Sequence, residues 1–269
     1  MRDMWYKDKF HIILVLVTYF VALFTILALS TVVFQGLTHF GKTLFCPEIA
    51  FAIRLSLYTS TVSTLMCILF AIPTAYVLAR MDIPCNKLLN TILDLPLAIP
   101  HLVSGFCILL LFGTTGLGTW LESMGVNIVF SPNGIILVQI FVNLPFMIRV
   151  MKSTILSVNP RLEFVARTLG CTPAQSFFKV TLPLSRNGII AGTVITWARA
   201  LGEFGGALIV AGATRFRTET LPVSLFLNMT TGDIGAAMAA ANILIAISLV
   251  SLFVFNKLGG DFIGGTRGL

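Results

Sequence analysis

Charged residues are scarce in this sequence. Asp, Glu, Lys and Arg make up 11% of its 269 residues, whereas soluble domains carry about 25%. With 57% hydrophobic residues, the chain lacks the polar side chains that would cover a water-soluble fold. The hydrophobic residues also fall in long blocks, and a helix of about 20 such residues crosses the roughly 30 Å apolar core of a bilayer. The sequence therefore predicts an integral membrane protein.

Clusters of reactive or metal-binding side chains are also lacking. The five cysteines form no C-x-x-C pair, and only Cys46 falls in a region expected on the external side of the membrane, so a disulfide or a cysteine metal site is not expected. No His, Asp or Glu cluster has metal-ligand spacing, and no serine has a base in its sequence context. We therefore predict no enzyme activity, no catalytic residue, no metal and no cofactor bound by this chain.

The hydrophobic blocks predict an all-α membrane domain that covers residues 1–269. Helices are favoured over a barrel because barrel strands are shorter and alternate apolar with polar residues. The first block is longer than the apolar region of a typical signal peptide, so we expect it to stay as a span. The six expected spans are residues 10–34, 51–79, 88–112, 133–151, 187–211 and 237–258.

The basic residues predict the orientation of these spans. If the N-terminus lies inside, the outer segments hold Lys42, Arg215 and Arg217, and the spans hold Arg54 and Arg199. By the positive-inside rule, both termini are expected on the cytoplasmic side of the cell membrane. The same asymmetry explains the net charge of +7 without a nucleic-acid partner. The inner segments hold thirteen basic residues: Arg2, Lys7, Lys9, Arg80, Lys87, Arg149, Lys152, Arg161, Arg167, Lys179, Arg186, Lys257 and Arg267.

Residues 36–43 read GLTHFGKT and fit the phosphate-loop pattern G-x-x-x-x-G-K-[ST]. That pattern binds phosphate only where a buried strand turns into a helix. Here it follows a membrane span that begins inside, so it lies on the external side. We interpret it as a chance match in an external loop.

The longest cytoplasmic stretch, residues 152–186, is not composed like a linker. Asn159 is a good N-cap with Pro160 at the first helical position, and Gly170 ends the helix that follows. Thr172 and Gln175 then form a capping box. We expect Leu182-Pro183 to limit this second helix to about eight residues, which is too short to be stable alone.

This short helix carries apolar side chains outside the membrane. Phe177, Phe178 and Val180 are most simply explained by docking into a groove on another protein. The pattern alone equally allows an amphipathic helix that lies on the lipid surface or packs under the bundle.

The segment resembles the "EAA" loop of ABC-importer permeases, E-A-A-x-x-x-G followed about nine residues later by I-x-L-P. The matching positions are Val165, Ala166, Gly170, Val180, Leu182 and Pro183, whereas the glutamate position of the pattern holds Phe164 and Glu163 lies one residue earlier. In that family the short helix is the coupling helix, which sits in a cleft of a separate ATPase. The resemblance therefore implies that the ATPase-coupling residues are Glu163, Ala166, Arg167, Gly170, Thr172, Pro173, Gln175, Phe177, Phe178, Leu182 and Pro183.

Two ionisable residues lie together in the fifth span. A charge at mid-bilayer costs about 2.5–3.5 kcal/mol on insertion scales, so such residues suggest function. Arg199 and Glu203 have the i, i+4 spacing that places two side chains on one helix face, where they can pair. The pair would either hold helices in register or line the cargo path. The spacing Gly188-x-x-x-Gly192 in the same span predicts close helix packing.

The third span contains prolines that interrupt its hydrogen bonds. Pro96 and Pro100 are followed by His101 and Ser104. A helix that restarts near Pro100 would point free N–H groups into the membrane, as the broken helices of transporters do. The alternative is a simple proline kink with a hydrogen-bonded histidine.

As a whole, the sequence resembles the permeases of molybdate/tungstate ABC importers, whose relatives carry sulfate or thiosulfate. The stretches DLPLAIPHLVSG, ARTLGCTPAQSFFKVTLP and RALGEFGGALIVAG carry this resemblance. It implies a type I importer permease fold, a homodimer, two ABC ATPase subunits that bind ATP and Mg²⁺, and an external oxyanion-binding protein. The rival reading is a secondary oxyanion transporter driven by an ion gradient, with Arg199 and Glu203 as its proton-linked pair. The candidate pathway residues are Arg54, Pro100, His101, Ser104, Arg199 and Glu203.

Overall fold

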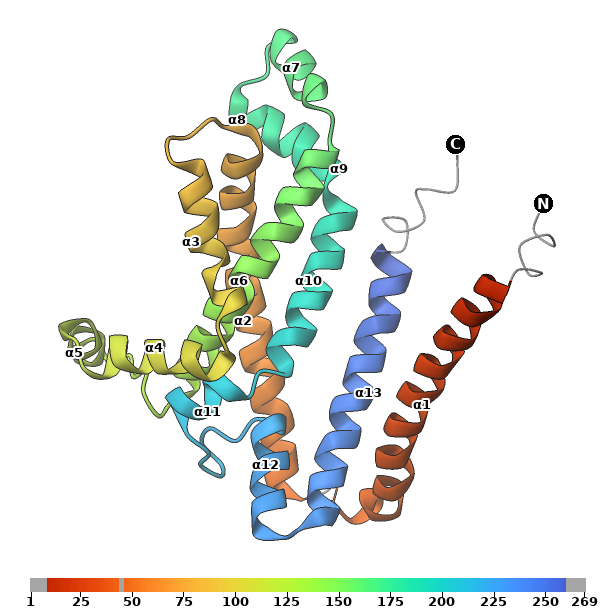
Figure 1. Ribbon diagram of the computed structural model, residues 1–269. Coiled ribbons are helices and arrows are strands. Elements are labelled where there is room, and N and C mark those ends of the chain that lie inside the picture. The colour runs from red at the N-terminus through yellow and green to blue at the C-terminus, as the bar shows by residue number, and fades with distance from the viewer. Residues whose placement is uncertain (1–8, 44–45, 260–269) are drawn as a thin grey trace.

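The computed structural model describes residues 9–43 and 46–259, and this part of the chain is helical with short connections and no strand (Figure 1). Four helices are long and apolar enough to cross a membrane. Each corresponds to a predicted span, although all extend beyond the predicted limits. They are α1 (Lys9–Thr43), α2 (Pro47–Arg80), α6 (Pro132–Ser157) and α13 (Ile234–Gly259).

The other two predicted spans are bent pairs of helices. α3 (Asn86–Ala98) and α4 (His101–Gly113) meet at 110°, and α10 (Arg186–Leu201) and α11 (Gly205–Ala211) meet at 56°. Counted as one span each, the pairs bring the total to six. The break before His101 confirms the predicted restart, because Pro100 cannot donate a hydrogen bond and forces Ile99 into an extended conformation. The fifth predicted span also has a break, which the sequence did not predict, because α10 ends at Leu201 and α11 begins at Gly205.

The centre of the bundle is the pair α2 and α6. Small residues of α2, including Ala71 and Ala75, are fully buried against Met147 and Met151 of α6, which lets the two backbones approach closely. α10 packs against both helices. A Cβ on Gly188 would lie 2.3 Å from the Thr154 hydroxyl of α6, so the predicted close packing of this span is confirmed.

Short helices cover the two ends of the bundle. At the end that is predicted to be cytoplasmic lie α7 (Pro160–Thr168), α8 (Pro173–Ser176), the π-helix η2 (Phe177–Thr181) and α9 (Leu182–Leu184) (Figure 1). Toward the opposite end lie α5 (Gly116–Ser123) and α12 (Leu221–Thr231), which the hydropathy pattern did not predict. Residues 36–43 were expected to form a loop, but their backbone continues α1 to Thr43. The phosphate-loop pattern therefore lies within a helix, without the strand-to-helix turn it requires.

Candidate functional site

Residues 152–186, which are predicted to be cytoplasmic and are called the cytoplasmic segment below, include a capped helix, as the sequence predicts. The N–H of Arg161 donates to the Asn159 side chain at 3.0 Å, and Pro160 is the first residue of α7. Gly170 follows with φ of +92°, a left-handed conformation that ends helices and favours glycine. Ala166 is half-buried and Arg167 is exposed on this helix.

The second helix starts with the predicted capping box. The N–H of Thr172 donates to Gln175 Oε1 at 2.9 Å, and the N–H of Gln175 donates to Thr172 Oγ1 at 3.2 Å. Pro173 is the first residue of α8. These reciprocal hydrogen bonds satisfy two backbone N–H groups that would have no partner at an uncapped helix end.

The predicted end of this helix at Leu182-Pro183 was wrong, because helical turns continue through Leu184. The chain widens into a π-helix, in which Leu182 N–H bonds to the carbonyl of Phe177 five residues earlier. A proline ring clashes with the carbonyl four residues back in an α-helix, and the wider turn makes room for it. Pro183 is exposed, whereas Leu182 borders a small cavity under the segment.

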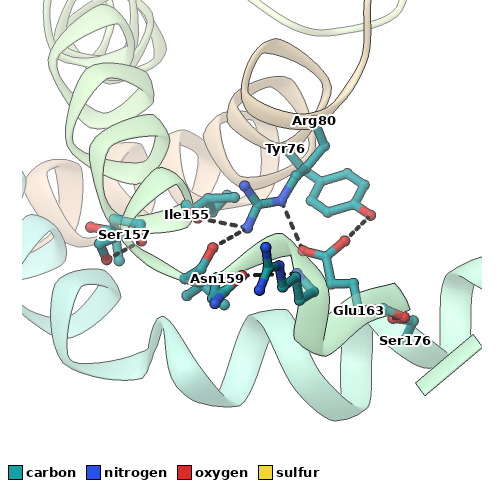
Figure 2. Close-up of polar contacts among 10 residues, drawn as sticks. Tyr76, Arg80, Ile155, Ser157, Asn159, Glu163 and Ser176 are labelled. Carbon is teal, nitrogen blue, oxygen red and sulfur yellow. Dashed lines mark hydrogen bonds and ion pairs between the residues drawn. The ribbon is translucent and has the colours of Figure 1, made fainter. Parts of the chain in front are cut away.

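Arg80, the last residue of α2, clamps this segment to the bundle (Figure 2). Its Nη2 donates to the carbonyls of Ile155 at 2.9 Å and Val158 at 2.6 Å, which lie at the C-terminal end of α6. Its Nε pairs with Glu163 Oε1 of α7 at 2.9 Å, and Tyr76 donates to Glu163 Oε2 at 3.1 Å. One guanidinium thus joins three helices, and it also supplies a positive charge at a helix C-terminus.

The environment of Glu163 favours its ionised form. Burial alone raises the pKa of this carboxyl, but the hydrogen bonds from Arg80 and Tyr76 and the charge of Arg80 outweigh that effect, so the pKa lies below its ordinary value of 4.5. The main-chain carbonyl of Glu163 also accepts a hydrogen bond from the Ser176 hydroxyl at 3.2 Å. Glu163 therefore connects α7 to both α2 and α8.

The two predicted docking aromatics point in different directions. Phe177 packs on the Tyr76 ring with centroids 4.8 Å apart, so it belongs to the interior and not to a free surface. Phe178 is 63% exposed. Phe164 and Leu169 are also exposed, and the sequence pattern did not single them out for docking.

Inside the membrane region, the two broken spans are joined to each other. His101 Nδ1, at the start of α4, lies 2.7 Å from Glu203 Oε2, in the break of the fifth span. The N–H of Gly206 donates to Glu203 Oε1 at 2.9 Å. A Cβ on Gly105 would lie 2.6 Å from Gly206 Cα, so α4 and α11 touch through their backbones. The Glu203 side chain is 1% exposed, and a buried polar group of this kind is costly unless it is hydrogen-bonded.

The predicted pairing of Arg199 with Glu203 was wrong. α10 ends at Leu201, so Glu203 no longer follows the helical spacing that would bring the two side chains together. Arg199 Nε instead donates to Asn143 Oδ1 of α6 at 3.1 Å, and its guanidinium lies over the Phe146 ring at 5.0 Å. Arg199 remains exposed.

Of the remaining pathway candidates, Pro100 and Ser104 lie beside this joint on α4, whereas Arg54 belongs to α2. Arg54 is exposed on α2, Pro100 caps α4, and Ser104 is fully buried with no hydrogen-bond partner for its hydroxyl among the described residues. Sequence reasoning missed two buried amides of α6, Gln139 and Asn143. Gln139 donates to the carbonyl of Ala200 at 2.8 Å in the last turn of α10. Polar residues within a predicted span were the signal that could have found them.

Six spans, two of which are broken and in contact with each other, with the capped segment of residues 152–186 held across their ends by Arg80, form a type I permease of the ABC importers. The chain belongs to the family described as the inner membrane component of binding-protein-dependent transport systems, whose model matches residues 71–259.

Sequence relatives include permeases with different cargo names. The sulfate transport system permease protein CysT of Escherichia coli K12 is 32% identical over 248 residues, which are 90% of each chain. The molybdenum transport system permease protein ModB of Mycobacterium tuberculosis is 37% identical over 211 residues, 78% of this chain and 80% of the relative. The molybdate/tungstate transport system permease protein WtpB of Pyrococcus furiosus is 37% identical over 216 residues, 80% of each.

Solved structures support the same fold. A chain of a bacterial ABC transporter that imports the acidic polysaccharide alginate matches with a TM-score of 0.74 and 18% identity, covering 95% of this chain and 98% of the other. A chain of the MetNI methionine ABC transporter matches with a TM-score of 0.58 and 18% identity, covering 81% and 95%.

Double-mutant cycles can test the joint between the broken spans. Alanine at His101 and Glu203, singly and together, is expected to show a coupling of about 1–3 kcal/mol in the free energy of unfolding, because the two side chains are in contact. The equivalent cycle for Arg199 and Glu203 serves as the control and should be additive within about 0.5 kcal/mol. Stronger coupling to Arg199 than to His101 would contradict the joint. The measurement is denaturation of the purified protein in detergent.

The lowered pKa of Glu163 predicts how the cytoplasmic segment responds to acid. Its ionised contacts stabilise the segment at all pH values above the ordinary pKa of 4.5, and this stabilisation is lost as the pH falls through the lowered native pKa. Hydrogen exchange of residues 160–176, corrected for its intrinsic pH dependence, should therefore speed up only below about pH 4.5. Glu163→Gln should remove this step, and identical profiles for the two proteins would contradict the role of the carboxylate.

Proposed function

We propose that this importer permease takes up a tetrahedral oxyanion, with molybdate or tungstate as the cargo, and that its cytoplasmic segment couples it to a separate ATPase. One observation carries the coupling proposal. The segment is held by the contacts of Arg80, yet its side chains Phe164, Leu169 and Phe178 are exposed. A short helix that is fixed on one side and apolar on the other suits transmission of force from a partner.

The connections of the segment determine which helices would move together with it. Its turns continue through α9 into α10, and α10 ends at the break that holds Glu203. A partner that moves the segment would therefore move α10 and, through His101, the start of α4. ATP and Mg²⁺ would bind to the partner, whose affinity for nucleotide differs between its open and closed forms and so drives the change.

The cargo proposal comes from the relatives. Three of them are named for molybdenum or for molybdate and tungstate, at 37% identity. Sulfate is the second candidate, because CysW of Synechocystis, a sulfate transport system permease protein, is also 37% identical over 202 residues. We propose that an external binding protein supplies most of the selectivity, while Arg54, Arg199 and the free N–H groups at the start of α4 offer a weak route for an anion.

Assembly follows from the same proposal. A single six-span chain supplies half a pathway, so we propose a homodimer about a two-fold axis with two ATPase subunits inside and one binding protein outside. The basic residues favour both termini on the cytoplasmic side. A secondary transporter is disfavoured, since the Arg199 and Glu203 pair on which that reading depended does not form.

Substituting one exposed aromatic tests the coupling proposal. Phe178→Asp should reduce binding of the co-purifying ATPase and ATP-driven uptake by at least about tenfold, as expected for an aromatic anchor. Insertion and dimerisation should persist, because Phe178 is 63% exposed. Phe130→Asp is the matched control, since Phe130 is 58% exposed outside the cytoplasmic segment. If the Phe178→Asp variant binds the ATPase as well as the wild type does, the coupling proposal is contradicted.

A competition panel tests the cargo. Uptake of labelled molybdate into vesicles that hold the complete assembly should be blocked by an excess of tungstate and only weakly reduced by the same excess of sulfate, because sulfate is smaller than the other two oxyanions. Uptake that depends on a sodium or proton gradient without ATP would contradict the proposal. Stronger competition by sulfate would favour the second candidate.

A further inference from the structure

The exposed face of the cytoplasmic segment is positively charged. Arg161, Arg167 and Lys179 are exposed, and within the described ranges none of their side chains makes a hydrogen bond or an ion pair. Glu163 is the one acidic residue between 152 and 186. Its side chain is 12% exposed and is already engaged by Arg80 and Tyr76. The segment therefore offers a partner cations and no free carboxylate.

The apolar part of this face departs from the family pattern that it resembles. That pattern has a glutamate where this chain has Phe164, and Phe164 is 67% exposed. Leu169, at 80%, and Phe178, at 63%, are exposed on the same segment. A partner surface that presents a cation opposite position 164 would meet an aromatic ring here and not a carboxylate.

A hollow beside α7 is bordered by one of these cations and by one of these exposed aromatic rings. It has a volume of about 420 Å³ and lies between the end of α2, α7 and α8, where Arg80, Phe164, Arg167 and Pro173 border it. Arg80 is neutralised by Glu163 at 2.9 Å, so the unpaired guanidinium at this hollow is that of Arg167. An entering group that is partly apolar and negatively charged matches these walls.

We infer that the ATPase subunit carries an apolar floor opposite Phe164 and Phe178 with an acidic rim, and that one of its acidic side chains enters the hollow to pair with Arg167. This inference rests on the proposed coupling function and names the chemistry of that partner. The like charges of the segment would repel an ATPase with a basic rim, so the same feature excludes wrong partners.

Charge variants test this inference in the full chain, reconstituted in discs of neutral lipid, with the nucleotide-hydrolysing subunit that co-purifies with the wild type. Arg167→Glu should weaken binding by about tenfold or more and flatten its salt dependence, because an acidic rim would then face a carboxylate. Arg167→Lys keeps the charge and should retain most of the affinity. Phe164→Glu should also weaken binding. Lys257→Glu, a charge reversal on an exposed residue of α13, is the matched control and should bind like the wild type.

The outcomes separate the inference from the proposed function. If Phe178→Asp loses the ATPase but Arg167→Glu binds normally or more tightly, the coupling function survives and the acidic rim is excluded. If both variants bind normally, the coupling function itself fails. If Arg167→Glu changes binding only in discs with phosphatidylglycerol and not in discs with phosphatidylcholine, the cations serve the lipid surface and the inference is overturned.

Discussion

The guanidinium of Arg80 is the contact on which the attachment of the cytoplasmic segment to the helix bundle depends. It bonds to two carbonyls at the end of α6 and to the carboxylate of Glu163, and its own helix is the centre of the bundle. Helices as short as α7 and α8 do not persist alone in water. Charge-assisted hydrogen bonds at a largely buried position are stronger than neutral ones, so this clamp makes the segment part of the rigid bundle and not a flexible connection.

Side-chain contacts also stabilise the two breaks in the membrane-spanning helices. A broken helix leaves backbone groups without partners, and each such group is costly in lipid. Glu203 accepts the Gly206 N–H and contacts His101, so one carboxylate serves both breaks at once. The breaks are also adjacent in space, since α4 and α11 touch at Gly105 and Gly206. The cytoplasmic segment, α10 and α4 thus form a continuous series of contacts from one end of the protein to its middle.

Local rules predicted much of this structure from sequence. Hydropathy located six spans, and cap residues located Asn159 and Thr172 as helix starts, because these signals act within a few residues. Long-range contacts were missed: Arg80 and Glu163 are 83 residues apart, and Gln139 and Ala200 are 61 apart. The assumption of an unbroken helix paired Arg199 with Glu203, whereas Arg199 bonds to the side-chain amide of Asn143. The directions of the Phe177 and Phe178 side chains depend on the π-helix, and the local sequence contains no signal for that helix.

That π-helix also fixes the length of the segment. Each residue added to or removed from a helix turns everything after it by about 100°, so one insertion between Ser176 and Leu182 would rotate α9 and the start of α10 around their axes. The faces that α10 turns toward α2 and α6 would then no longer match. Most surface connections tolerate changes in length. In this segment the amino acids can vary at several positions, whereas the number of residues cannot change without misplacing α10.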